Sequence, residues 1–225
     1  MHLPYVRRVV LALSVLMLTT SCGGGDERAA QDGPATARAA GSQAPQAAPL
    51  SEAELASRSL TPQDLPDHKV EEALQGAVIS ADRPECRDLA TLLLGGVMTN
   101  TLGQVHTKAT KGTTETKVSL HSWPATKAHT VITDVLAGGQ ACGGGFNAVR
   151  GTEKVKITKV VNTPSASGDE SVAYTAEQEL DGEKSTIEVV LVRKNTTTAG
   201  FTAISPSEAT DKPTAIVAAQ LKKLS

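Results

Sequence analysis

Aromatic side chains are scarce in this sequence, and basic residues are not in excess. Only 2% of the 225 residues are aromatic, and 22 Lys and Arg stand against 24 Asp and Glu. A protein that binds nucleic acid needs a basic surface or a platform of stacked rings. We therefore expect no nucleic-acid partner, and we expect the few rings to pack in the core.

The sequence also lacks the local motifs of catalysis and metal binding. There is no H-E-x-x-H and no pair of histidines four residues apart, so a metal site would need distant parts of the chain. The stretch "GDES" at 168–171 lacks the G-x-S-x-G elbow of a serine nucleophile, and Asp169 and Ser171 fit a turn better. We predict no enzyme, no metal and no cofactor, with His121, Asp169 and Ser171 as the residues that would test this.

Other polar groups also have a structural explanation. The run Gly143 to Gly145 follows an expected helix and does not precede one, so it is not a phosphate-binding loop. Lys154, Lys156 and Lys159 are the best candidates for an acidic partner, but their alternation with apolar residues favours a solvated strand face. We expect exposed, structural roles for the histidines His68, His106, His121 and His129.

The apolar run near the N-terminus is too short to cross a membrane. Residues 9–18 would rise about 15 Å as a helix, which is roughly half the thickness of a bilayer core. Arg7 and Arg8 precede the run and small residues follow it. These features predict a signal peptide over residues 1–21.

Cys22 follows the small residues directly, in a pattern that resembles the lipobox of bacterial lipoproteins. The pattern departs at Thr19, where that family usually has leucine. We predict cleavage before Cys22 and acylation of its thiol by diacylglycerol and palmitate-like chains, which would hold the protein on the extracytoplasmic face of the cell membrane. Ordinary secretion with a free thiol is the alternative. Residues 22–50 then form the lipidated start and a flexible Ala/Gly/Pro/Gln linker, and residues 51–225 form one domain.

With Cys22 acylated, two cysteines remain. In an exported protein an even pair favours a disulfide, so we predict a bond between Cys86 and Cys142, with two unpaired buried thiols as the alternative. The spacing at 84–95 predicts a helix with Cys86, Leu89 and Leu93 facing inward, and a second helix should end near Cys142.

The remaining pattern indicates an antiparallel sheet. A hairpin is expected over 106–123 with a turn near Lys111 and Gly112, and Lys117, Ser119 and His121 should lie on its solvent face. A short helical turn is expected over 60–65 and a helix over 211–224, with further strands over 154–162, 171–180, 186–194 and 200–204. The fold class is α+β, a sheet of about five to seven strands packed by helices in a two-layer sandwich.

The order of short motifs resembles the PknH-like sensor domains of actinobacteria. These motifs are "LTPQDLP", "DRPECRDLA", "SLHSWP", "ACGGG", "SGDESVAY", "VVLVRK" and "AIVAAQLKKL", which span residues 60–224. Such domains form the extracellular parts of certain serine/threonine kinases and also occur as lipoproteins. Kinase representatives carry a second disulfide that this sequence lacks.

The resemblance implies a cleft for an unidentified ligand. We predict a membrane-anchored, non-catalytic ligand-binding or sensing module, with an apolar cleft between sheet and helices. Its partner would be an unknown small molecule, a lipid or an envelope protein. The alternative is a lipoprotein with a structural or protein-interaction role in the cell envelope.

Overall fold

A computed structural model describes residues 47–205 and 212–225. The predicted signal peptide, Cys22 and most of the linker lie outside the described residues. Within the described ranges, no helix has the length and apolar character needed to cross a membrane.

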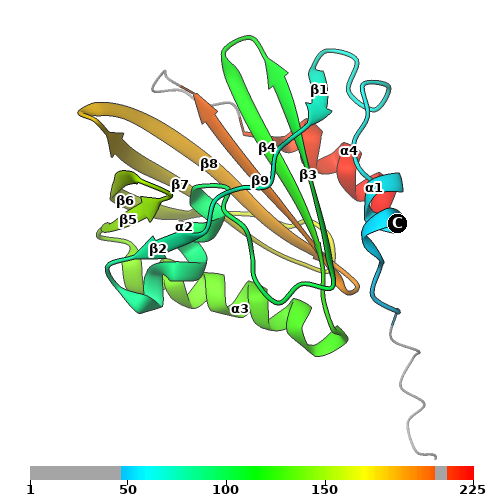
Figure 1. The fold of residues 1–225 in the computed structure, drawn as a ribbon, viewed down its shortest axis with the longest axis horizontal. Helices are drawn as coiled ribbons and strands as arrows, with labels where there is room; N and C mark the ends of the chain where they lie inside the picture. The colour runs from blue at the N-terminus through cyan, green and yellow to red at the C-terminus, as the bar shows by residue number, and fades with distance from the viewer. Residues whose placement is uncertain (1–46, 206–211) are drawn as a thin grey trace, which may run out of the picture. The chain divides into compact units, whose positions relative to one another are not determined.

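One antiparallel sheet organises the domain (Figure 1). It has nine strands in the order β1-β3-β4-β9-β8-β7-β6-β5-β2, which is more than the five to seven predicted. The strands are β1 Lys69–Glu72, β2 Ile79–Ala81, β3 Gly103–Lys111, β4 Thr114–Ser122, β5 Phe146–Arg150, β6 Glu153–Thr163, β7 Glu170–Leu180, β8 Glu183–Lys194 and β9 Thr197–Ser205. The central meander from β6 to β9 follows from short turns, as the sequence predicts.

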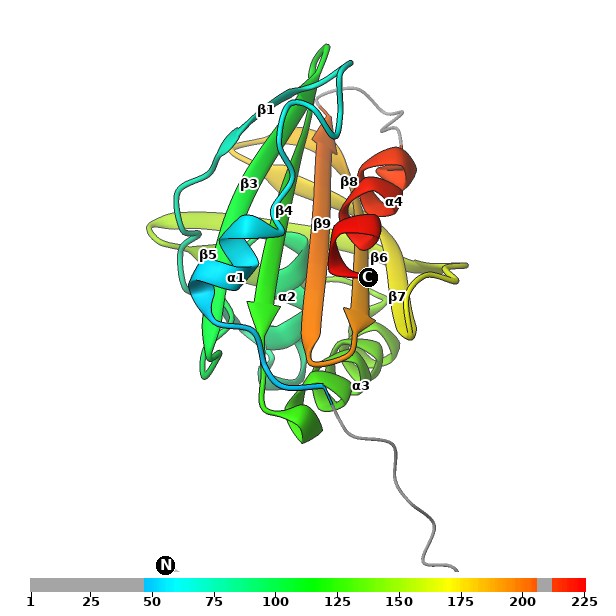
Figure 2. The same cartoon turned by 90° about the vertical axis from the view of Figure 1, so that its right-hand side faces the viewer.

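Helices cover both faces of this sheet, which differs from the predicted two-layer sandwich. The helical elements are α1 Glu52–Ser57, η1 Pro84–Cys86, α2 Arg87–Leu93, α3 Ala125–Cys142 and α4 Thr214–Leu224. Helices α2 and α3 pack on one face and α1 and α4 on the other, so two apolar clusters form (Figures 1 and 2). Helix α1, which the sequence analysis does not predict, carries only one buried apolar side chain, Leu55.

The helices α2 and α3 pack against each other as the sequence predicts. Cys86, Leu89 and Leu93 are fully buried beneath α3. The structure joins Cys86 to Cys142 by a disulfide with a Cα separation of 5.9 Å. The bond ties the start of α2 to the end of α3.

The hairpin of β3 and β4 forms as predicted, but its polar face is buried. His121 is 2% exposed and Ser119 is 7% exposed, although both were expected to face solvent. The cause is residues 73–78, here called the strap, which join β1 to β2 across this face (Figure 1). The strap meets the end of α2, where Val97 N donates to Ala77 O over 3.1 Å and Lys117 Nζ donates to Gly95 O over 2.6 Å.

The predicted helical turn over 60–65 is a hydrogen-bonded turn instead of a helix. Thr61 N and Thr61 Oγ1 both donate to Asp64 Oδ2, over 2.8 and 2.7 Å. Lys223 of α4 forms an ion pair with the same carboxylate over 2.8 Å. The ion pair therefore links α4 to this turn.

Candidate functional site

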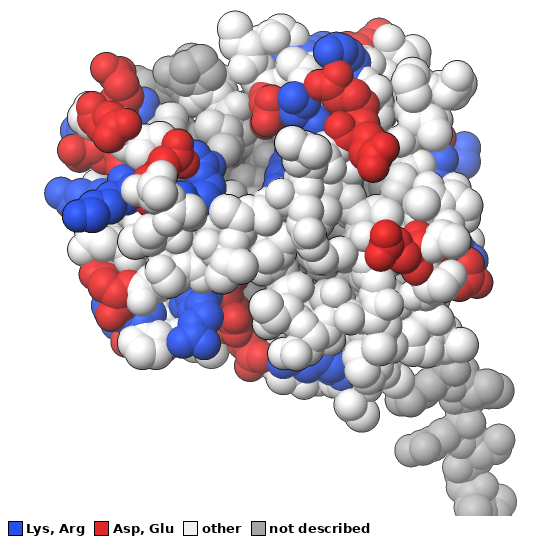
Figure 3. Space-filling view, viewed as in Figure 1, with Lys and Arg blue, Asp and Glu red and all other residues white. Residues whose placement is uncertain are grey.

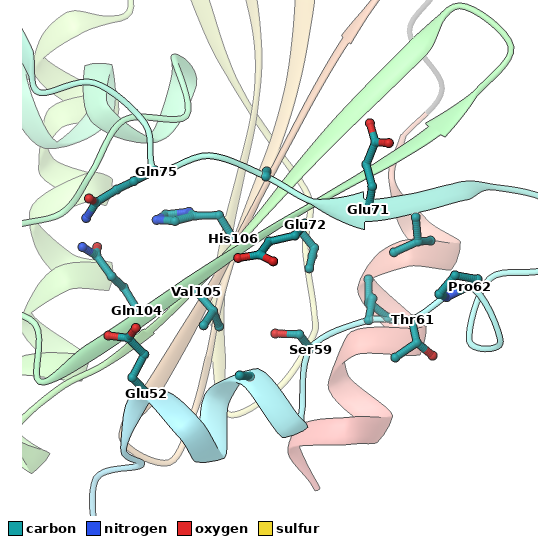
Figure 4. A pocket seen from close by; sticks show the side chains of 15 residues that line it. Glu52, Ser59, Thr61, Pro62, Glu71, Glu72, Gln75, Gln104, Val105 and His106 are labelled. Atoms are coloured by element: carbon teal, nitrogen blue, oxygen red, sulfur yellow. The ribbon is translucent and has the colours of Figure 1, made fainter.

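A groove runs along the outer edge of β3, between α1 and the end of β1 (Figure 4). It encloses about 550 Å³, which is within the range of small-molecule sites. Strand β1 pairs with β3 only from Thr107 to Thr110, and Ala73 N then donates to His106 O over 3.0 Å. Among the described residues no strand pairs with the outer edge of β3 from Gly103 to Val105. The groove occupies the space that the divergence of β1 leaves.

Helix α1 forms the wall opposite β1. Ser51 caps it, because Glu54 N donates to Ser51 Oγ and Ser51 N donates to the Glu54 carboxylate. Gly103 allows the helix to lie close to β3, since a Cβ there would lie 2.9 Å from Glu52 N. This approach places Glu52 at the mouth of the groove (Figure 4).

Three carboxylates line the groove, from Glu52, Glu71 and Glu72, and no Lys or Arg does. Glu71 is paired with Lys69 and Lys108, at 2.6 and 3.0 Å, and hydrogen bonds from these two lysines lower its pKa. The other two carboxylates are exposed and have no ion-pair partner among the described residues. In Figure 3 acidic side chains lie over β1, together with basic ones, and also beside α1, with uncharged surface between the two groups.

Two buried histidines lie beneath one end of this groove. The imidazoles of His106 and His121 are in edge contact, with ring centroids 5.7 Å apart, and His121 also contacts the Trp123 ring at 6.0 Å. Burial, with a smaller effect of Lys117, lowers the pKa of His106 to about 4. Burial also lowers the pKa of His121 to about 3, with further contributions from His106 and Lys117. Both rings are therefore neutral at pH 7. The predicted exposure of these two histidines is wrong, since His106 is 6% exposed and His121 is 2% exposed.

His106 Nδ1 lies 2.9 Å from Ser119 Oγ, within the range of a nucleophile and its base. No carboxylate orients the ring, since Nε2 has no hydrogen-bond partner in the described structure. A pKa of about 4 also makes this imidazole a weak base at neutral pH. The pair therefore lacks the third group of a triad. This pair was not predicted from the sequence, although the predicted hairpin places the two residues on adjacent strands.

The residues weighed as catalytic candidates are not brought together. Asp169 accepts a hydrogen bond from Asn195 N over 2.7 Å, as expected of a turn residue. Ser171 Oγ accepts from Ser167 N over 3.1 Å. These contacts fix the loop before β7 and leave no shared site with His121.

The lysines of β6 follow the strand pattern predicted for them. Lys154 and Lys156 are exposed and alternate with the buried Val155 and Ile157. Lys159 lies 3.8 Å from the Glu177 carboxylate. The run Gly143 to Gly145 ends α3, and Gly145 N donates to Cys142 O over 3.0 Å.

Across residues 47–205 and 212–225, no group of three His, Cys, Asp or Glu side chains could hold a metal ion. Trp123 lines a smaller hollow of about 160 Å³ together with Met98 and Val131. Its indole Nε1 donates to Thr198 Oγ1 over 2.8 Å. Arg87, Asp88, Lys127 and Asp134 also line this hollow, and it is much smaller than the groove beside β3.

Two solved structures align with this chain. The extracellular domain of PknH from Mycobacterium tuberculosis aligns with a TM-score of 0.54 at 12% identity, covering 79% of this chain and 97% of that one. A putative uncharacterised protein from Mycobacterium smegmatis aligns with a TM-score of 0.40 at 15% identity, covering 77% and 95%. The chain has the fold of a PknH extracellular domain. No protein-family model matches the sequence, and no curated protein matches it.

Proposed function

We propose that this protein is a non-catalytic ligand-binding or sensing module, anchored by lipid at Cys22 on the extracytoplasmic face of the cell membrane. The groove beside β3 carries the proposal, because it combines about 550 Å³ of space with unpaired polar groups. The fold shared with a kinase extracellular domain supports the extracytoplasmic assignment. The weak base and the absence of a triad around His106 favour binding over turnover.

A role in protein interaction is the second candidate function. The edge of β3 from Gly103 to Val105 presents backbone groups to which an extended partner segment could add as a strand. Protein interaction would use the same groove as ligand binding, so the two functions differ only in the kind of molecule that the groove holds.

We expect a tryptophan at Ala56 to fill the groove and expel its occupant. Ala56 is exposed on α1 and lines the groove, whereas Ala53 is exposed on the same helix and does not line it. Wild-type protein, A56W and A53W would be purified gently from the native host and analysed by native mass spectrometry. A bound mass in wild type and A53W that is absent from A56W supports the proposal.

The mass itself separates the two functions, since a small molecule indicates sensing and a polypeptide indicates protein interaction. An occupant that A56W retains in full would place the binding site elsewhere. Turnover on ester, peptide, phosphate or glycoside substrates that depends on Ser119 and His106 would move the protein into the enzyme class.

A further inference from the structure

All the charged side chains that line the groove beside β3 are negatively charged. The exposed carboxylates of Glu52 and Glu72 have no counter-ion among the described residues, and no Lys or Arg lines the groove. The third carboxylate, from Glu71, is already compensated by Lys69 and Lys108. Two uncompensated negative charges thus remain on opposite walls, one on α1 and one at the end of β1 (Figure 4).

Two buried side-chain atoms at the inner end of the groove have no hydrogen-bond partner. His106 lines the groove, is 94% buried and leaves Nε2 without a partner, and Gln104 Oε1 is likewise buried without a partner. When Nδ1 of the neutral ring donates to Ser119 Oγ, Nε2 carries a lone pair. A buried acceptor without a donor costs about 1–3 kcal/mol. The site can recover this free energy from a ligand that supplies N–H groups.

Gln75 determines access to these two acceptors. Its side chain is exposed on the strap and lies beside His106 and Gln104 in Figure 4. Neither unpartnered atom is reached by solvent. For a ligand to approach the two acceptors from the groove, the Gln75 side chain would have to move.

We propose that this groove binds a small organic amine with at least two ammonium groups, such as a linear polyamine. An ammonium group has three donors and no acceptor, so it complements both the carboxylates and the inner acceptors. One ammonium group lies between Glu52 and Glu72, and the other donates to Gln104 Oε1 and His106 Nε2. This assignment rests on the proposed function and specifies the ligand of the same groove.

The test measures spermidine binding to the mature full-length protein by isothermal titration calorimetry at low ionic strength. Wild-type protein should bind, and E52Q/E72Q should bind about tenfold more weakly or worse, because hydrogen bonds to charged groups contribute about 1.5–3 kcal/mol each. Both residues are exposed, so this variant should keep the fold. The matched control E179Q/E183Q removes two negative charges from the β7–β8 hairpin and should bind as wild type does.

Two further measurements locate the amine. H106F removes the inner acceptor and should weaken spermidine binding, with its fold checked by circular dichroism. Rising salt should weaken wild-type binding, as expected of exposed charge pairs. Binding of a lysine-containing peptide is measured in a separate experiment, because a lysine side chain also supplies an ammonium group.

Absence of spermidine binding to wild-type protein would overturn the proposal, as would equal affinities of wild type and E52Q/E72Q. Binding of the peptide alone would overturn it as well, since the ligand would then be a polypeptide. Failure of the amine proposal can be distinguished from failure of the proposed function. A neutral molecule that co-purifies with wild-type protein and is lost in A56W would support ligand binding in the groove and exclude an amine as the ligand.

Discussion

Two histidines lie inside the domain with their imidazole rings in contact. Neither nitrogen of His121 has a hydrogen-bond partner, and His106 uses only one of its two. The nearest charged group is Lys117, whose own pKa is lowered by burial and by Arg150. No described carboxylate compensates a proton on either ring, so the fold tolerates these histidines only in their neutral form.

The free energy of unfolding should therefore fall as the pH drops from 7 toward 4.5. An unfolded chain binds protons at its histidines below a pKa of about 6.5, whereas the folded pKa values are about 4 and about 3. The unfolded state thus binds more protons in this window, and each histidine should cost about 2 kcal/mol of stability at pH 5. Urea denaturation at pH 7.5 and pH 5 measures this loss.

The double variant H106Q/H121Q should lose most of this pH dependence, and H129Q, at an exposed position, should keep it. Asp64 does not account for the effect, since its pKa is lowered to about 2, mainly by a hydrogen bond from Lys223, and it contributes only at more acidic pH. A stability that is flat from pH 7.5 to 5 would show that the rings are protonated without cost.

Helix α3 lies close to the sheet because a glycine faces β7. A methyl group on Gly139 would overlap the ring of Tyr174, which is 1% exposed and donates its hydroxyl hydrogen to Val135 O over 3.3 Å. The same helix packs on α2 at Gly138, where a Cβ would lie 3.2 Å from Leu89 Cβ. The position of α3 thus depends on two consecutive small residues.

We expect G139A to destabilise the domain by about 1–3 kcal/mol, the usual cost of an extra methyl group in a packed core. The higher helix propensity of alanine offsets this by up to about 1 kcal/mol. The melting temperature of G139A compared with wild type measures the net effect. G144A is the control, because nothing lies within 4 Å of a Cβ at that position. A G139A variant as stable as wild type would mean that the Tyr174 ring moves freely.

The elements with a strong periodic signal were predicted well. The sequence indicates α2, α3, α4, the β3–β4 hairpin and the meander from β6 to β9, because each carries buried residues at regular spacing. It does not indicate α1, β1, β2 or β5, which have three to six residues each. Elements this short hold too few apolar positions to show a period.

The candidate site was not predicted, for the same physical reason. The strap has no periodic pattern, and Leu74 and Val78 are 92% and 69% exposed, so nothing in its sequence shows that it covers β3 and β4. When the strap is not taken into account, the alternating pattern of the hairpin predicts that His121 and Ser119 face solvent. The groove itself depends on where β1 leaves β3, which is a property of the backbone and of no single residue.

At the scale of the whole molecule, function depends on where the domain is held. Residues 1–46 lie outside the described structure, so the anchor stays a prediction from the sequence. Replacement of Cys22 by alanine should release the protein from membranes into the soluble exported fraction, because the predicted acyl chains would then have no thiol to carry them. Phase separation in a cloud-point detergent, followed by immunoblotting, measures the partition.

A serine replacement elsewhere, such as the exposed Ser57→Ala, is the control and should stay in the detergent phase. Wild-type protein found in the aqueous phase would show that Cys22 is not acylated.

The strap also limits how wide the sheet can be. It joins the two outermost strands, and the seven Cα steps from Glu72 to Ile79 reach at most about 25 Å. Nine flat strands would place their outer members about 38 Å apart. The reach of the strap is shorter than the width of a flat nine-stranded sheet, so the sheet must be curved. The length of this one loop thus sets an upper limit on how far apart the two edges of the sheet can lie where the strap joins them.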